Sequence, residues 1–223
     1  MSSTNKKISF IVLFCILGIA ALQVPITRLA GSKSTFTLFD LFGPIATAFI
    51  GTTAGVISVF FMQFANFLIH GAKVVDAGTI IRFFPMLFAA WYFGKKHPLQ
   101  LIVPIAAIIA FTTHPIGKDV WYFSLYWLIP IFCYFIRSHS IVARSLGATF
   151  TAHAVGGALW IYAFNLPRTV WDALIPVVAI ERLVFALGIA GAYIIFNNIL
   201  NYVAQKRVPQ LKFMVDERYL VVK

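Results

Sequence analysis

The chain has 223 residues, of which 61% are hydrophobic and 11% are charged, and its mean hydropathy is +0.88. Soluble domains carry roughly a quarter charged residues, so this composition excludes an ordinary soluble domain and predicts a multi-pass protein of the cell membrane. The net charge of +11 then belongs to loops that face lipid headgroups, and no basic surface of the kind that binds nucleic acid is expected.

Apolar runs separated by short polar breaks predict an all-α transmembrane bundle of about eight segments, or about six if some are re-entrant or broken. The expected helices lie near residues 8–27, 37–50, 53–70, 78–94, 99–113, 120–136, 144–164 and 173–203. Lys6 and Lys7 precede the first run as in a signal peptide, but no small-residue cleavage site follows, so we expect a retained helix. A turn at Gly51-Thr52-Thr53 divides the second segment from the third.

Lys and Arg are more frequent in the loops on the side of the two termini, which predicts that both termini are cytoplasmic. Residues 1–223 are expected to form one transmembrane domain, with 204–223 as a basic cytoplasmic tail. Cys15 and Cys133 lie in apolar segments, so neither a disulfide framework nor a thiolate metal site is predicted. Because phosphate-binding loops and metal-ligand or nucleophile motifs are missing, we expect no cofactor, no metal, no catalytic residue and no enzyme.

This orientation places most polar residues of the helices in the outer half of the membrane. The candidate substrate-binding residues are Asp40, Asn66, Arg82, His153, Trp160, Glu181 and Arg182. An ionisable side chain at this depth costs about 2.5–3.5 kcal/mol, so such groups face the protein interior and find partners. Two interpretations stay open: buried ion pairs that fix the order of the helices, or a polar pocket open to the outside.

The sequence "VVAIERLVFALG" places Glu181 and Arg182 next to each other in an apolar helix. Adjacent residues point about 100° apart on a helix, so the sequence predicts that each reaches a different neighbour. Arg82 is the expected partner of Glu181, whereas Arg182 is expected either to meet Asp40 or to point into a water-filled cavity.

His153 lies beside Ala148, Ala152 and Gly156, whose four-residue spacing lets a neighbouring helix approach closely. Both a packing role and a ligand-binding role remain open for this histidine. The aromatic residues expected at the outer interface form a membrane belt or stack on a planar ligand; they are Trp121, Tyr122, Tyr126, Trp127, Trp160 and Tyr162.

The stretch "FTLFDLFGPIATAFIGTTAGVISVFF" resembles the second and third helices of the S components of energy-coupling factor vitamin transporters, and the likeness covers about the first half of the chain. The resemblance implies an outward pocket for a small solute, with a coupling membrane subunit and two ATPases on other chains. The family has six helices and an Ala-x-x-x-Ala pattern in the first; here Ala106 and Ala110 carry that pattern in another helix.

The leading functional hypothesis is therefore the substrate-binding subunit of an ATP-driven importer, which captures an anionic or zwitterionic, vitamin-like solute. One alternative is an accessory membrane subunit whose polar layer is purely structural. A second alternative is an intramembrane enzyme in which His153 is the general base and Glu181 its partner.

Overall fold

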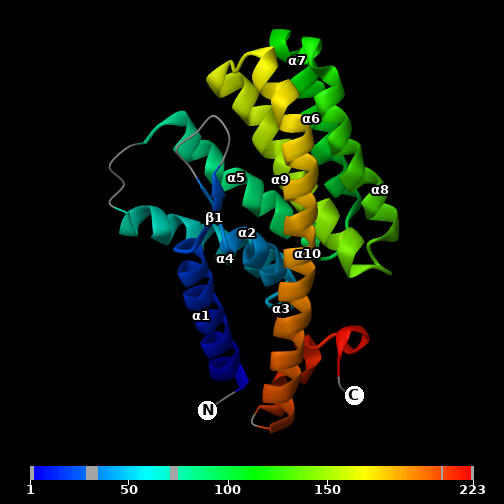
Figure 1. Cartoon of the computed structure of the whole chain (residues 1–223). Helices are drawn as coiled ribbons and strands as arrows, with labels where there is room; N and C mark the ends of the chain where they lie inside the picture. The colour runs from blue at the N-terminus through cyan, green and yellow to red at the C-terminus, as the bar shows by residue number, and fades with distance from the viewer. Residues whose placement is uncertain (1–2, 29–34, 71–74, 207, 222–223) are drawn as a thin grey trace.

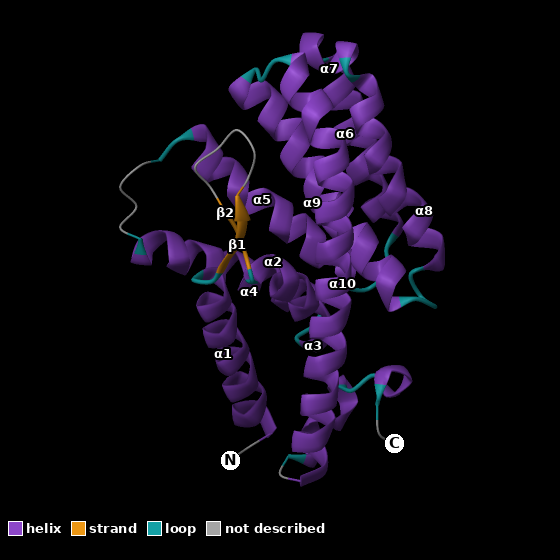
Figure 2. Cartoon of the chain, in the orientation of Figure 1, coloured by secondary structure: helices purple, strands orange, loops and turns teal. Residues whose placement is uncertain are grey.

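The computed structural model describes residues 3–28, 35–70, 75–206 and 208–221, and this part of the chain is almost entirely helical (Figures 1 and 2). The α-helices are α1 (Ser3–Leu22), α2 (Phe39–Phe42), α3 (Ala46–Phe49), α4 (Thr52–Ile69), α5 (Ala77–Phe93), α6 (Ile102–Thr113), α7 (Pro115–Asp119), α8 (Ile129–Ile136), α9 (Ile141–Phe164) and α10 (Arg168–Lys206). Short 3₁₀ helices cover Gly43–Ile45, Pro98–Leu101, Trp121–Leu128, Pro209–Met214 and Glu217–Tyr219. Strands β1 (Pro25–Arg28) and β2 (Thr35–Thr37) form one antiparallel pair.

The long predicted helices are found within a few residues of their expected bounds, but three predicted segments needed correction. The first was expected to reach residue 27, yet α1 ends at Leu22 and β1 begins at Pro25. The proline ring disfavours the helical conformation of the residue before it, so a helix usually ends before a proline. The expected helices 37–50 and 120–136 are each broken by a 3₁₀ stretch. Proline lies in the first turn of the 3₁₀ helix Gly43–Ile45, at Pro44, and in the first turn of α8, at Pro130, where its missing N–H is tolerated.

The segment Phe39–Phe49 is too short to cross a membrane, since at 1.5 Å per residue it spans only roughly 16 Å of a core of about 30 Å. In contrast, α4 and α10 are long and apolar enough for a crossing.

The predicted turn before α4 is confirmed: Gly51 adopts φ +93°, which is accessible to glycine at little cost. A Cβ on Gly55 would lie 2.6 Å from the Thr47 Cα, so α3 and α4 pack backbone to backbone.

Helix α9 lies at the centre of the fold and packs against α5, α6, α8 and α10. One buried core surrounds Phe14, Phe93 and Tyr193 and joins α1–α5 to the C-terminal half of α10. A second core surrounds Phe111 and Trp127 and joins α6–α9 to the N-terminal half of α10. Helix α10 therefore belongs to both cores and runs almost the whole length of the molecule (Figure 1).

Small residues of α9 lie against α5: a Cβ on Gly156, which belongs to the predicted ladder, would meet Pro85 at 3.5 Å, and Gly147, outside that ladder, lies closer still. Tyr92 of α5 is fully buried, and its ring lies so close to Gly147 that a Cβ there would be 2.3 Å from the ring. The Tyr92 hydroxyl donates to the Pro130 carbonyl oxygen at 2.8 Å, which also ties α5 to α8. The distance between α5 and α9 thus depends on the Tyr92 ring, which packs directly on the backbone of α9 at Gly147.

Two arginines, Arg137 and Arg144, cap the C-terminal end of α5. Arg137 is 4% exposed and donates to the Gly94 carbonyl oxygen at 2.7 Å and to Gln100 Oε1 at 2.9 Å. Arg144 donates to the Phe93 carbonyl oxygen at 2.6 Å. The last carbonyls of a helix lack backbone donors, so a basic side chain there is stabilising.

The predicted tail, residues 204–223, is folded against the helices where it is described. Residues 204–206 continue α10, and 208–221 turn back along it. The Asp216 N–H donates to Asn197 Oδ1 at 2.8 Å, and Asn197 Nδ2 donates to the Asp216 carbonyl oxygen at 2.9 Å. Arg218 donates to the Ser138 carbonyl oxygen at 2.8 Å, so the tail also contacts the segment between α8 and α9.

Docking of this tail is expected to weaken at low pH. Hydrogen bonds from Arg218 hold the pKa of the Asp216 carboxyl below its ordinary value of 3.8. A lowered pKa in the folded state means that the stabilisation is present above that ordinary value and is lost as the pH falls through the folded value. Hydrogen exchange of residues 209–219, corrected for its intrinsic pH dependence, should therefore accelerate below about pH 4. Asp216→Asn should already exchange faster at neutral pH and lose this acceleration; unchanged protection would contradict the prediction.

Candidate functional site

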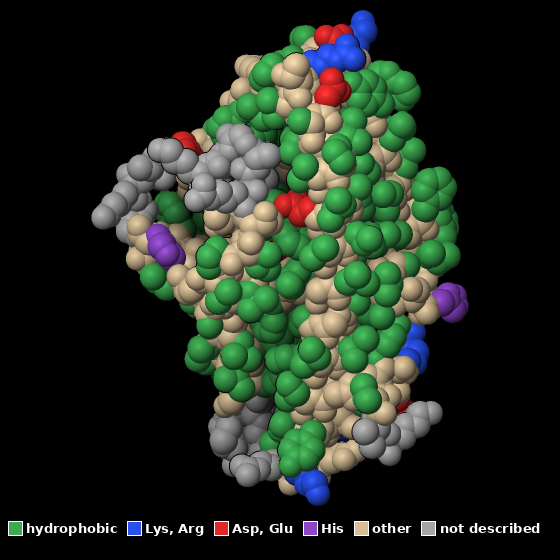
Figure 3. Space-filling model, viewed as in Figure 1, with side chains coloured by type: hydrophobic (Ala, Val, Ile, Leu, Met, Phe, Trp, Pro, Cys, Tyr) green, Lys and Arg blue, Asp and Glu red, His purple; other side chains and the backbone are tan. Residues whose placement is uncertain are grey.

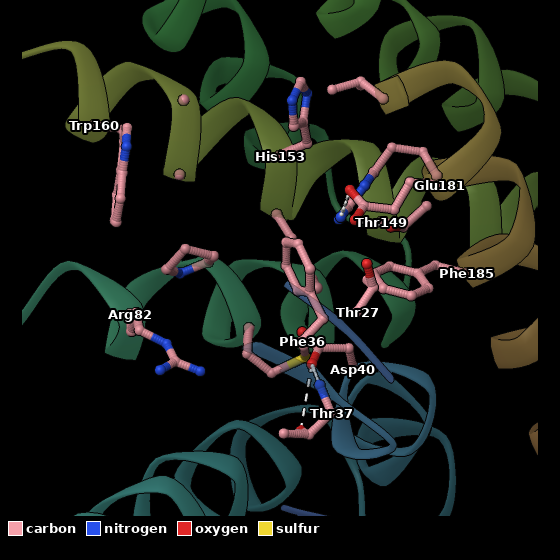
Figure 4. A pocket seen from close by; sticks show the side chains of 18 of the residues that line it. Thr27, Phe36, Thr37, Asp40, Arg82, Thr149, His153, Trp160, Glu181 and Phe185 are labelled. Carbon is pink, nitrogen blue, oxygen red and sulfur yellow. Dashed lines mark hydrogen bonds and ion pairs between the residues drawn. The ribbon is translucent and has the colours of Figure 1, made fainter. Parts of the chain in front are cut away.

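A cavity of about 210 Å³ lies between the β1–β2 pair, α2, α5, α9 and α10 (Figure 4). Six predicted site residues, drawn from four segments far apart in the sequence, line it: Asp40, Arg82, His153, Trp160, Glu181 and Arg182. Asn66 is not among the lining residues; its side-chain oxygen accepts a hydrogen bond from Gln23 at 2.7 Å, which links α4 to the end of α1. The folded chain therefore brings together most of the polar layer but not Asn66.

Glu181 and Arg182 form an ion pair with each other, contrary to the predicted pairing. Arg182 Nη2 lies 2.6 Å from Glu181 Oε2, and the two side chains are only 4% and 16% exposed. Within the described residues, no ion pair joins Arg82 to Glu181 or Asp40 to Arg182. The long, flexible side chain of Arg182 reaches the side chain of the adjacent Glu181. The 100° between adjacent positions on a helix therefore does not exclude an ion pair between them.

The guanidinium of Arg182 lies between two aromatic rings. Its carbon is 4.7 Å from the ring centroid of Phe36 in β2 and 4.6 Å from that of Phe185 in α10. Nη1 donates to Thr149 Oγ1 at 3.3 Å, whereas the buried Nε has no hydrogen-bond partner in the described structure. Aromatic faces stabilise a desolvated cation, so Arg182 is held firmly while one of its N–H groups stays unsatisfied.

Asp40 and Arg82 fix the β1–β2 pair against the cavity. Asp40 Oδ2 accepts from the Thr37 N–H at 2.7 Å, and Arg82 Nη2 donates to the Thr35 carbonyl oxygen at 2.9 Å. Figure 4 shows Arg82 and Glu181 on opposite sides of the cavity, with Phe36 between them. The remaining N–H groups of the exposed Arg82 therefore face a different part of the cavity from the buried ion pair.

His153 is held by packing and by one hydrogen bond. The indole N–H of Trp127 donates to His153 Nδ1 at 3.0 Å, and an indole N–H can only donate. Nδ1 is thus unprotonated and the ring carries its proton on Nε2. The rings of Phe123 and Phe150 lie 5.5 and 6.1 Å from the imidazole. Among the described residues no hydrogen bond joins His153 to Glu181, so the acid–base pair of the enzyme hypothesis is not formed.

The aromatic residues expected at the outer interface differ in exposure, and Tyr122 and Tyr126 are half-buried. Trp121 and Tyr162 are more than half exposed, which fits a membrane belt. Trp127 is fully buried, and Trp160 is 9% exposed with its ring centroid 4.2 Å from that of Phe164. For these two residues the belt interpretation is wrong, and Trp160 instead forms a wall of the cavity.

Several lining residues were not predicted as site residues, including Phe36, Thr149 and Phe185. Phe36 lies in "TFT", a strand of only three residues. The alternation of polar and apolar residues that predicts a strand cannot be recognised over three positions next to an apolar helix. Phe185 follows Arg182 by three positions, so its place on the same face of α10 could have been inferred from the helical period.

In the parts of the chain that the structure describes, no group of three or more His, Cys, Asp or Glu side chains is arranged to hold a metal ion. Comparisons of the chain with protein-family models, with curated proteins and with solved structures found no match.

Proposed function

We propose that this chain is a multi-pass protein of the cell membrane that captures a small, partly polar solute from the outer side, as the substrate-binding subunit of an ATP-driven importer. The observation that carries the proposal is the cavity that Asp40, Arg82, Glu181 and Arg182 line together. Ion pairs whose only role is to fix the order of the helices would leave no hydrogen-bonding group without a partner. Here the buried Nε–H of Arg182 has no partner, and it lies beside a cavity large enough for a small molecule.

The surface supports embedding in a membrane. Large apolar side chains that are more than 50% exposed occur on most of the long helices that the structure describes; they include Ile16, Phe61, Ile80, Ile109, Phe132 and Ile180. Soluble proteins rarely expose so much apolar surface. In Figure 3 green side chains cover the middle of the visible face, while most Lys and Arg lie toward its two ends. The first and last described residues lie at the same end of the molecule (Figure 1), which supports an orientation with both termini on one side.

The cavity chemistry favours a solute that combines a planar part with an anionic group. Aromatic side chains, including Phe36, Phe123 and Trp160, form much of the wall and suit a flat ring. Glu181 neutralises Arg182, which leaves Arg82 as the cation best able to receive a carboxylate. Asp40 and the second oxygen of Glu181 offer acceptors, so a zwitterionic solute fits better than a purely anionic one.

In this proposal the energy for import comes from other chains. The S components that the sequence resembles work with a coupling membrane subunit and two ATPases, and we extend that arrangement to this protein. Solute, membrane lipid and these subunits would then be its partners.

The test is ligand-induced stabilisation of the purified protein. A panel of water-soluble vitamins and their precursors is added singly, and the melting temperature is measured in detergent. A ligand at 100 times its dissociation constant stabilises the folded state by about 2.7 kcal/mol, which is readily seen as a shift. Arg82→Ala should weaken binding of the ligand that is found by roughly tenfold or more, since it removes a charged hydrogen bond.

Arg168→Ala is the matched control, because Arg168 is also an exposed arginine and does not line the cavity. Equal ligand affinity in wild type, Arg82→Ala and Glu181→Gln would show that the solute binds elsewhere. If no compound or cell extract shifts the melting temperature, the accessory-subunit alternative is favoured; the ion pair of Glu181 with Arg182 is the observation that supports it.

A further inference from the structure

A second hollow, the α1–α10 groove, lies apart from the solute cavity. It has a volume of about 1070 Å³ and is lined by side chains of α1, α2, α10 and the tail. Nearly all of them are apolar; they include Leu13, Leu17, Leu41, Ile195, Ile199 and Leu211. The ribbons of α1 and the lower half of α10 are separated in Figure 1, and most side chains that line the groove belong to these two helices. Small residues widen it: a Cβ on Gly191 would meet no atom within 4 Å.

The length of the groove argues against a membrane-spanning helix as its occupant. Along α10 it runs from Gly188 to Val203, which is about 22 Å at 1.5 Å per residue. At its other wall it ends at Val24 and Leu38, where the Leu38 N–H donates to the Val24 carbonyl oxygen and the chain crosses from α1 to α2. A helix spanning a core of about 30 Å would collide with this crossing, but the acyl chains of one leaflet need little more than half that length.

Two lysines near the cytoplasmic end of the groove favour a lipid with an anionic headgroup. Lys206 ends α10, Lys212 follows the groove residue Leu211, and both lysines are exposed. With the termini cytoplasmic, these lysines lie at the level of the inner headgroups, where anionic lipids are concentrated. A partner helix would itself tend to carry Lys or Arg at its cytoplasmic end and would be repelled there.

We propose that the α1–α10 groove binds the acyl chains of an anionic phospholipid of the inner leaflet, whose phosphate lies beside Lys206 and Lys212. The inference rests on the membrane embedding and orientation proposed above, but not on solute binding. Phe10 and Phe14 of α1 contact Phe196 of α10, and the lipid would fill the space that remains open between the two helices.

The experiment compares lipid binding to the delipidated full chain in detergent by native mass spectrometry. Dioleoyl phosphatidylglycerol and dioleoyl phosphatidylcholine are titrated in parallel. Two lysines near the headgroup are expected to favour the anionic lipid by roughly thirtyfold at low salt. Lys206→Gln with Lys212→Gln should remove most of this preference, whereas Lys95→Gln with Lys96→Gln, an exposed pair outside the groove, should leave it unchanged.

Filling the groove should abolish tight lipid binding altogether. Gly191→Phe places a ring in the groove from α10, and Ala20→Phe places one from α1. If one of these variants folds poorly, lipid binding by the other still tests the proposal. Leu187→Phe is the control, because Leu187 is exposed on α10 outside the groove. Equal lipid retention in wild type and in the filled variants overturns the proposal. So does a dimer that the filled variants dissociate, since a second copy would then occupy the groove.

Failure of this inference and failure of the proposed function are distinguishable. Solute stabilisation that persists in Gly191→Phe, together with unchanged lipid binding, removes only the lipid site. A chain that stays monodisperse and folded without detergent removes the membrane embedding on which both proposals depend.

Discussion

Arg182→Met is expected to lower the free energy of unfolding by about 3–5 kcal/mol, the range found when one partner of a buried ion pair is removed. The substitution leaves Glu181 without its counter-ion in a site where its side chain is only 16% exposed. It also removes the donor to Thr149 and the cation between Phe36 and Phe185. Denaturant unfolding in detergent, followed by tryptophan fluorescence, measures the loss.

Removing both charges provides the internal control. Arg182→Met combined with Glu181→Leu should recover much of the stability, because replacing a buried pair by apolar groups is often neutral. Arg82→Ala should cost less than about 1 kcal/mol, since Arg82 is exposed and lies outside the ion pair. If the double variant is as unstable as the sum of the two single changes, the residues are not coupled and the pair does not form as described.

Gly147→Ala is expected to destabilise the protein by about 1–3 kcal/mol, the usual range for overpacking a tight core. The new methyl carbon would lie 2.3 Å from the ring of Tyr92, which is fully buried and tied through its hydroxyl to Pro130. The ring cannot move away without breaking that hydrogen bond, so α5 and α9 must separate.

Gly191→Ala is the matched control, because it makes the same change in a helix where the added carbon meets no atom within 4 Å. Alanine favours helix by up to about 1 kcal/mol over glycine, so this variant should be as stable as wild type or more stable. Thermal unfolding of both variants in the same detergent tests the comparison. Similar melting temperatures for the two would contradict the close packing of Tyr92 on α9.

Hydropathy and helix-stop signals determined most of the helical order of this chain. Apolar runs and their breaks predicted α4, α5, α9 and α10 within a few residues, and the turn at Gly51 followed from the length of the run around it. These features are local, because a helix satisfies its backbone hydrogen bonds within one segment. The small β1–β2 pair was missed for the opposite reason: each strand needs a partner that is distant in sequence.

The hydropathy pattern gave each polar residue an expected depth, and this expectation also predicted which polar residues gather. Asp40, Arg82, His153, Trp160, Glu181 and Arg182 line one cavity because ionisable and polar groups avoid lipid wherever they lie along the chain. Whether they bind a solute is the question that the ligand experiment addresses.

Only the tertiary structure decided which of these residues are partners. Glu181 pairs with its neighbour Arg182, His153 accepts from Trp127, and Asn66 accepts from Gln23. A helical period fixes the direction of a Cα–Cβ bond but not the path of a long side chain, so it does not select the partner of a charged group. The choice among them depends on rotamers and on the packing of Phe36 and Phe185 around Arg182, which exist only once the helices have assembled.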